Sequence, residues 1–438
     1  MKQADTDLKT PMHAAYTRRG QQLFSRWRCS VRGRLRRIVN LAKQTINARW
    51  MFGQFIPLQT LNRTVFEYDV VYSGDPDVYW PEVKSLEGAP NLSICLWPQA
   101  FSPPYHYRVK NAVLSGLDII DPEAPTRVLM ELLTNPVPIT EGRAWTFDAA
   151  KRRRTLRRAE GETVQAGDAY VFSTPNWTNY YHFLIDAAAR FVELKDAGAI
   201  RDDTEIFFHG EINEWQSQYL RLLGLRADRL SRLPAAGEPP LRAKSVLIGS
   251  APRARLACPP RSIERLRQVV LSAAQGTNAE GTRRLYISRG DAAKRRLLNE
   301  AELLPILENE GFEILTLECM PVAQQLALFR EALVIVAPHG AGLTNMIWSD
   351  RPTIIELLPA DRWNLGGFAT LAHVIGSRYQ PVVANYDEPK AYIRSDRDDR
   401  DYAIAPHLVQ SALHAVVAGS GPRGRDRTPI CREAGATG

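Results

Sequence analysis

The stretch "LVIVAPHGAGLTNMIW", residues 333–348, decides how the second half of this chain folds. It begins with an apolar run of the length of a buried strand and passes through two glycines into a segment with helical patterning. Glycines at a strand-to-helix turn let backbone N–H groups approach a ligand, and a helix start adds about half a positive charge. The turn His339, Gly340, Ala341 and Gly342 is therefore suited to phosphate.

Similar alternation surrounds this stretch. Strand patterns occur at 169–173, 205–210, 245–250, 284–290, 312–317, 353–359 and 379–385. Helical patterns lie between them at 178–196, 214–225, 261–275, 299–309, 321–332, 341–348 and 367–377. Strands alternating with helices indicate βαβ units around parallel sheets. The fold class predicted is α/β, with two Rossmann-like domains and a ligand-binding cleft between their strand ends.

The sequence divides into four predicted parts. Residues 1–60 form a basic N-terminal arm, and 61–275 an α/β domain that begins with irregular β structure. Residues 280–418 form the second Rossmann-like domain, and 419–438 a tail of disordered composition.

The net charge of +8 is concentrated in the arm, where twelve Lys and Arg residues oppose only Asp5 and Asp7 within residues 1–50. The rest of the chain is slightly acidic, which argues against a nucleic-acid-binding protein. Apolar residues recur among the arginines at helical spacing. The arm is therefore either an amphipathic segment that binds an anionic membrane surface or a solvated, partly disordered one.

The cysteines and the hydropathy pattern point to the cytoplasm. Five scattered cysteines form no CxxC pair, which argues against a disulfide framework and a structural zinc site. We find no run of about 18 apolar residues and no secretory signal. We therefore expect a cytoplasmic protein, with peripheral attachment to the inner membrane face if the arm binds lipid.

A second basic segment, "YISRGDAAKRRLLNE" (286–300), accompanies the glycine turn. Its strand ends with Ser288 and Arg289, and Arg295 and Asn299 follow. Arginine forks bind phosphate oxygens bidentately, so Arg289 is expected at the same ligand as the glycine turn. A solvated helix start would explain either Arg295 or Arg296 equally well.

Glu356 lies on the strand after the glycine turn and its helix. A carboxylate there can accept both hydroxyls of a ribose, or can be an ordinary acid at a strand end.

The stretch "NWTNYYHFLIDAAARF" (176–191) supplies a candidate base. His182 and Asp186 are four residues apart and hence on one helix face. An imidazole beside a carboxylate has the composition of a general base, although a locally satisfied pair would look the same. Which of the two would take the proton is left open.

The segments "YYHFLID", "YISRGDAAKRRLLNE", "VAPHGAGLTNMIW" and "IIELLP" together resemble glycosyltransferase family 61, whose bacterial members are often capsular polysaccharide biosynthesis proteins. The resemblance covers roughly 170–383. It implies a GT-B fold and an inverting transfer, without an essential metal or cofactor, from a nucleotide diphosphate sugar to a glycan or lipid-linked glycan. His182 and Asp186 would lie on the acceptor side. The donor side would hold Ser288, Arg289, Arg295, Asn299, His339, Gly340, Ala341, Gly342, Asn345 and Glu356. Arg190 followed by Phe191 departs from the family pattern, which leaves the end of that helix open.

Three other functions are compatible with parts of the sequence. An esterase would share an HGAG motif but needs a GxSxG elbow, which is absent. A metal-dependent transferase could use Asp75 and Asp77 as a DxD motif, although a turn explains this pair adequately. A catalytically silent scaffold of a polysaccharide assembly would be favoured if His182 or Asp186 were missing, and both are present.

Overall fold

The computed structural model describes most of the chain from residue 162 to 418 and several strands before it. The described residues are 54–56, 68–73, 78–79, 99–100, 105–116, 118–120, 127–129, 145–148, 153–156, 162–172, 176–226, 230–235, 237–249, 260–275, 281–290, 292, 294–359, 367–384 and 401–418. The predicted basic arm lies outside this set except for 54–56, and so do the predicted tail, Asp75 and Asp77.

The first sheet is mixed. Its order within the described residues is β1 (Gln54–Ile56), β7 (Arg127–Leu129), β6 (Asp118–Ile120), β5 (Tyr105–Ser115), β13 (Leu241–Gly249), β10 (Val164–Val171), β11 (Glu205–Phe208) and β12 (Ser231–Arg232), with β2 (Tyr68–Ser73) also paired to β5. Strands β13, β10, β11 and β12 are parallel, as predicted. The β5 strand joins β13 antiparallel. The segment predicted as irregular β structure therefore extends the same sheet.

Two small strand pairs lie outside this sheet. They are β3 (Val78–Tyr79) with β4 (Gln99–Ala100), and β8 (Trp145–Asp148) with β9 (Arg153–Leu156), and both pairs are antiparallel.

The second sheet is parallel throughout. Its order is β15 (Phe312–Leu315), β14 (Arg283–Ile287), β16 (Ala332–Pro338), β17 (Thr353–Leu358) and β18 (Arg378–Val383). In chain order this is 2-1-3-4-5, a doubly wound arrangement. All six residues of β17 are buried, as expected for a central strand covered on both faces.

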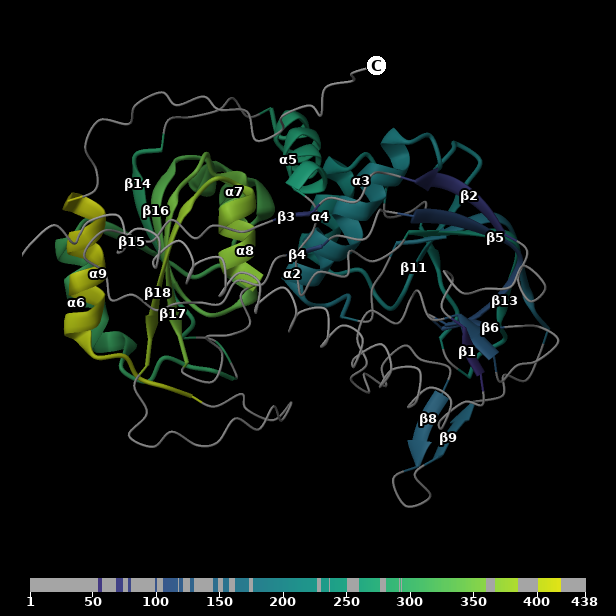
Figure 1. Ribbon diagram of the computed structural model, residues 1–438, viewed down its shortest axis with the longest axis horizontal. Coiled ribbons are helices and arrows are strands. Elements are labelled where there is room, and N and C mark those ends of the chain that lie inside the picture. Colours follow the sequence, from purple (N-terminus) through teal and green to yellow (C-terminus); the bar gives the residue numbers. More distant parts are fainter. Residues whose placement is uncertain are drawn as a thin grey trace, which may run out of the picture.

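Helices connect the strands of both sheets. In chain order they are α2 (Tyr180–His182), the π-helical turn η3 (Phe183–Ala188), α3 (Ala189–Asp196), α4 (Glu214–Leu222), α5 (Pro260–Ala273), α6 (Glu300–Asn309), α7 (Val322–Arg330), the 3-10 helix η5 (Ala341–Trp348), α8 (Gly367–Val374) and α9 (Pro406–Ala418). Helices α2–α5 lie between the two sheets (Figure 1), where α2 and α5 contact η5 and α4 contacts α7. Helices α6 and α9 lie on the opposite side of the second sheet.

One hydrophobic core is continuous between the two sheets. It contains buried residues of the first half, such as Phe172 and Tyr219, together with Phe329 and Trp348 of the second. A separate cluster that includes Leu303, Leu307 and Val409 fills the space under α6 and α9. The architecture is a mixed α/β fold with parallel sheets, which fits the Rossmann-like type predicted from the sequence.

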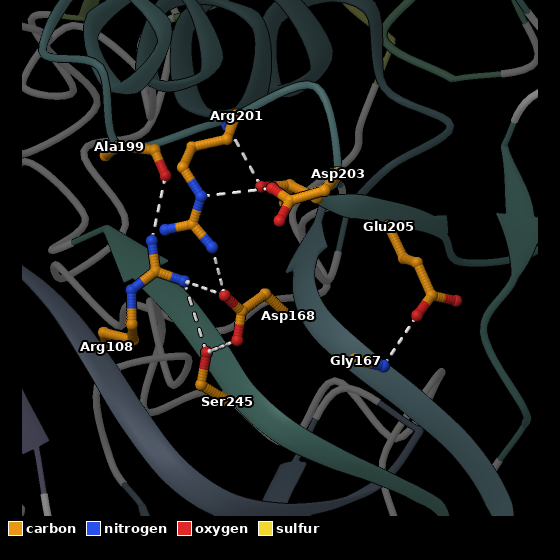
Figure 2. A network of polar contacts seen from close by, with 9 residues as sticks. Arg108, Gly167, Asp168, Ala199, Arg201, Asp203, Glu205 and Ser245 are labelled. Carbon is orange, nitrogen blue, oxygen red and sulfur yellow. Dashed lines mark hydrogen bonds and ion pairs between the residues drawn. The ribbon is translucent and has the colours of Figure 1, made fainter.

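A polar network ties three strands of the first sheet together (Figure 2). Asp168 on β10 accepts from the Ser245 hydroxyl on β13 at 2.6 Å and forms an ion pair with Arg108 on β5 at 3.3 Å. It also pairs with Arg201. The Ser245 hydrogen bond lowers the pKa of Asp168 most, and the two arginines lower it further, although burial opposes them.

The described helices do not include one that is both long and apolar enough to cross a bilayer.

Candidate active site

The order of the second sheet identifies where a ligand is expected. Strands β14 and β16 are neighbours, yet the chain leaves β14 toward β15 on one side and continues from β16 toward β17 on the other. Open α/β sheets bind ligands outside the carboxyl ends of the strands at such a switch point. Ser288 and Arg289 follow β14 there, and His339 and Gly340 follow β16.

Arg289 lies directly over Gly340. A Cβ added to Gly340 would be 1.9 Å from Nη1 of Arg289 and 2.7 Å from its Cζ. The backbone of Gly340 is extended, with φ −177°, so the close approach of the guanidinium, and not backbone conformation, is what excludes a side chain. Arg289 also donates from Nη2 to the carbonyl of Lys294 at 3.2 Å. The two segments predicted to share a ligand are therefore in contact.

His339 is held by Glu356. The ring Nδ1 is 2.6 Å from Oε1 of Glu356, and the hydroxyl of Tyr379 donates to the other carboxylate oxygen. Glu356 is 2% exposed. Burial, followed by the negative charge of Glu356, raises the pKa of Tyr379 well above its usual value. Glu356 thus lies beneath His339 and not on an accessible surface, which does not fit the predicted direct contact with a ribose.

Tyr402 lies under the same strand ends and was not predicted from the sequence. Its hydroxyl donates to the carbonyl of Leu357 at 2.8 Å, and that carbonyl also accepts from the backbone N–H of His339. Burial raises the pKa of Tyr402 and the charge of Glu356 adds to the increase, while the charges of Arg289 and Arg295 oppose it. These charged groups are therefore close enough to act on one buried hydroxyl.

Asn299 and Arg296 hold the segment that carries Tyr402. The Asn299 side chain donates to the carbonyl of Ile404 at 2.9 Å and accepts from its N–H at 3.1 Å. Arg296 pairs with Asp401, with 2.6 Å between Nη2 and Oδ2. In this structure Asn299 acts as a brace for the donor side, which differs from the ligand contact predicted for it.

Asn345, also predicted on the donor side, lies inside the protein. Asn345 is 0% exposed. Its Oδ1 accepts from the Tyr180 hydroxyl at 2.6 Å and from Trp348 Nε1 at 3.1 Å, and its Nδ2 donates to Gln325 at 2.9 Å. Asn345 is therefore buried, and its hydrogen bonds join η5 to α2.

The remaining predicted donor-side residues form the local frame of the site. The Ser288 hydroxyl accepts from the N–H of Gly290 at 3.2 Å, and Arg295 is half-buried with a left-handed backbone of φ 55°. Ala341 begins the 3-10 helix, where an ordinary helix was predicted. A Cβ on Gly342 would be 3.1 Å from Leu317, so this glycine lets the turn pack closely on the sheet.

The second predicted pair is formed as expected. His182 Nδ1 and Asp186 Oδ2 are 2.6 Å apart, and their side chains are 20% and 18% exposed. Asn179 caps the helix by accepting from the N–H groups of Tyr181 and His182. The pair spans the start of the π-helical turn, a feature that often occurs at functional sites. The helix continues past the buried Arg190 to Asp196, which resolves the open helix end.

Two aromatic rings connect the two histidine–carboxylate pairs. The Tyr181 ring lies edge-on to His182 at 5.5 Å between centroids and to Phe368 at 5.6 Å. Phe368 in turn contacts His339 at 5.4 Å. The acceptor-side and donor-side residues predicted from separate parts of the sequence are therefore joined through Tyr181 and Phe368.

A metal site of three or more His, Cys, Asp or Glu side chains does not occur among the residues that the structure describes. Asp75 and Asp77, the alternative DxD pair, are outside those residues.

Comparison with known proteins gives two matches. The family model "Glycosyltransferase 61" matches residues 180–355, which contain both histidine–carboxylate pairs except for Glu356. The EGF domain-specific O-linked N-acetylglucosamine transferase of Drosophila melanogaster is 28% identical over 147 residues, covering 30% of this chain and 28% of that protein. The chain thus spans less than a third of the length of this curated relative. Both comparisons support the enzyme class predicted from the motifs, a glycosyltransferase, through a segment similar to glycosyltransferase family 61.

Proposed function

We propose that this protein is an inverting glycosyltransferase that moves a sugar from a nucleotide diphosphate sugar to a hydroxyl group of a glycan in capsular, exo- or lipopolysaccharide synthesis. The proposal of a transfer rests mainly on the placement of Arg289 and His339 at the switch point. The His182–Asp186 pair is connected to His339 through the rings of Tyr181 and Phe368. In a GT-B arrangement, the donor would lie at the second sheet and the acceptor would enter from the first.

The transfer proceeds by direct displacement. The His182–Asp186 pair takes the proton of the acceptor hydroxyl as its oxygen attacks the anomeric carbon. The bond from that carbon to the diphosphate oxygen breaks on the opposite face, so the configuration inverts. The nucleoside diphosphate leaves with the bonding electron pair. Arg289, His339 and the N–H groups that begin η5 stabilise the negative charge that develops on it.

A thermal-shift screen against nucleotide sugars and nucleoside diphosphates tests the donor. A ligand that binds only the folded state raises the free energy of unfolding, by about 2.7 kcal/mol at a ligand concentration 100 times Kd, and so raises the unfolding temperature. We expect one nucleotide series to stabilise the wild type and to lose its effect in Arg289→Ala. No response to any nucleotide would contradict the proposal.

The acceptor and the metal requirement need an activity assay. With the donor identified, transfer is measured to oligosaccharide acceptors and to folded domains that offer serine and threonine hydroxyls, because the Drosophila relative is named for an EGF domain. Transfer to oligosaccharides supports a glycan acceptor, and transfer only to protein would mean that the acceptor is a protein instead.

The metal requirement is tested in the same assay. We expect activity in excess EDTA. Loss with EDTA and recovery with Mn²⁺ would favour the metal-dependent alternative.

The basic arm supports a place at the cytoplasmic face of the membrane. Each basic residue near an anionic surface contributes about 1 kcal/mol, and residues 1–50 hold twelve of them. We expect the full-length protein to sediment with anionic liposomes at low salt, and a protein that lacks residues 1–50 but keeps β1 to stay in solution. Equal behaviour of the two proteins would contradict attachment through the arm.

A further inference from the structure

Glu356 is the most deeply buried carboxylate at the site, and a buried charge must be compensated by its surroundings. Two hydrogen-bond partners are seen among the described residues, the Tyr379 hydroxyl and Nδ1 of His339. The three groups come from or directly follow the adjacent parallel strands β18, β17 and β16. The sheet itself therefore fixes their spacing.

We propose that Glu356 and Tyr379 are positioning residues for His339, an inference that rests on the proposed function for its catalytic consequence. The Tyr379 hydroxyl donates to one oxygen of Glu356 and orients the carboxylate. The other oxygen accepts the Nδ1–H of His339. An imidazole bound at Nδ1 directs Nε2 away from that partner, so Nε2 is the ring atom presented to the donor diphosphate.

A second contact defines the plane of the same ring. Phe368 on α8 contacts His339 edge-to-face, with 71° between the ring planes. A hydrogen bond and a ring contact from different elements together leave the imidazole little freedom to rotate. The imidazole needs a single orientation to contact the leaving group, because a catalytic group misplaced by about 1 Å can lower the rate about 100-fold.

Comparison with the other pair shows why Glu356 is assigned to positioning and not to substrate contact. Asp186 is 18% exposed and can meet an acceptor, whereas Glu356 is 2% exposed. A ribose hydroxyl would need to replace His339 or Tyr379 to reach it. The two pairs have the same 2.6 Å separation but different access, so they carry different roles.

The first test needs no ligand. Protein labelled with ¹⁵N-histidine gives the ring nitrogen signals of His339, assigned by their absence in His339→Ala. We expect Glu356→Gln, which keeps shape but removes charge, to shift the Nδ1 signal, and Tyr379→Phe to shift it less. Asp186→Asn is the matched control and should shift His182 while leaving His339 unchanged. Unchanged His339 signals in both Glu356→Gln and Tyr379→Phe would overturn the proposal.

The second test separates positioning from ribose contact by calorimetry. The probes are UDP, GDP, CDP and ADP and, for the nucleotide that binds, its 2′,3′-dideoxy form. Glu356→Gln and His339→Ala should each weaken binding about tenfold or more, for the ribose and dideoxy forms alike. The double variant Glu356→Gln/His339→Ala should bind the nucleotide with an affinity within about twofold of His339→Ala alone, because Glu356 acts through His339. Two results together would show a ribose contact instead. The fold losses of affinity in Glu356→Gln and His339→Ala would multiply in the double variant, and Glu356→Gln would not change the affinity for the dideoxy nucleotide.

The two tests fail independently. If the wild type binds none of the nucleotides, the proposed function is overturned, while the ring signals of His339 still decide whether Glu356 holds it.

Discussion

Gly340 is the residue on which the position of Arg289 depends, since any Cβ there would overlap the guanidinium. Gly340→Ala should leave the fold intact, because the atom it meets is the far end of a flexible side chain. The displaced Arg289 should weaken nucleoside diphosphate binding at least about tenfold, or 1.4 kcal/mol. Calorimetry measures the change.

Gly290→Ala is the control for this prediction. A Cβ at Gly290 would have its nearest neighbours at 3.5 and 3.6 Å, which is ordinary contact, so its affinity should stay close to wild type. Wild-type affinity in Gly340→Ala, alongside weak binding in Arg289→Ala, would mean that the arginine reaches the ligand from another position.

His182 and Asp186 carry the second prediction at this scale. His182→Ala and Asp186→Asn should keep donor binding but lose turnover about 10²–10⁴-fold, the usual contribution of a general base. Asp196→Asn, at the end of the same helix and paired with Arg265 at the surface, should keep turnover. Single-turnover rates together with donor Kd separate the two effects. Full activity in both site variants would remove this helix from the mechanism.

The elements of the first sheet meet at Asp168, which bonds groups on β5 and β13. Its lowered pKa means that the folded state holds the carboxylate ionised at a pH where the unfolded chain binds a proton. This stabilisation is complete above the unfolded pKa of about 4 and is lost as pH falls through the lower folded value. Asp168→Asn should therefore lower the urea midpoint near neutral pH, with a difference that shrinks below about pH 4.

Asp203→Asn is the matched control, because Asp203 also pairs with Arg201 but is 73% exposed. An exposed pair contributes about 0–1 kcal/mol, so this variant should unfold near the wild-type midpoint at every pH. A constant gap between Asp168→Asn and wild type from neutral to acid pH would contradict the linkage argument.

Elements with a long, regular pattern were the predictable ones. The parallel strands of the second sheet follow from apolar runs such as 333–338, and the helix that holds His182 and Asp186 follows from periodicity. The 3-10 geometry of 341–348 did not follow, because hydrophobic spacing hardly distinguishes helix types over eight residues. The burial of Asn345 and Glu356 could not be predicted for another reason. Both are polar residues in motifs, and only the packing around them shows that they face inward.

No sequence motif contains Tyr379 or Tyr402, so neither residue could be predicted as part of the site. Tyr379 is 23 residues from its partner Glu356, and Tyr402 is 45 residues from Leu357. A buried hydroxyl is recognised by the acceptor it reaches, which a sequence does not display.

At the scale of the whole molecule, Asn345 provides one of the hydrogen bonds between the two halves, and the Val322 N–H to Gln218 Oε1 bond is another among the described residues. Asn345→Ala would leave Trp348 Nε1 and Gln325 Oε1 without this partner in the buried interior, whereas the Tyr180 hydroxyl keeps its hydrogen bond to the Tyr219 hydroxyl. Each buried group left unsatisfied costs about 1–3 kcal/mol, so the two groups together predict a fall in stability of roughly 2 kcal/mol or more. The unfolding temperature measures it.

Tyr180→Phe provides a graded control for this link. It removes one hydroxyl and leaves Asn345 bonded to Trp348 and Gln325, so its loss of stability should be smaller. An Asn345→Ala protein that unfolds at the wild-type temperature would show that the buried hydrogen bonds are replaced by others.

The continuous core also affects how strongly the two halves of the protein associate with each other. The link from Tyr180 to Asn345 joins residues 165 positions apart, and aromatic rings from both halves pack around it. We therefore expect the halves to stay together even when the covalent connection between Gln275 and Gly281 is cut. Two separate polypeptides divided there would behave as the subunits of an obligate heterodimer, each exposing an apolar face until it meets the other. A gene for this protein could accordingly be split in two without separating the residues that meet at the site.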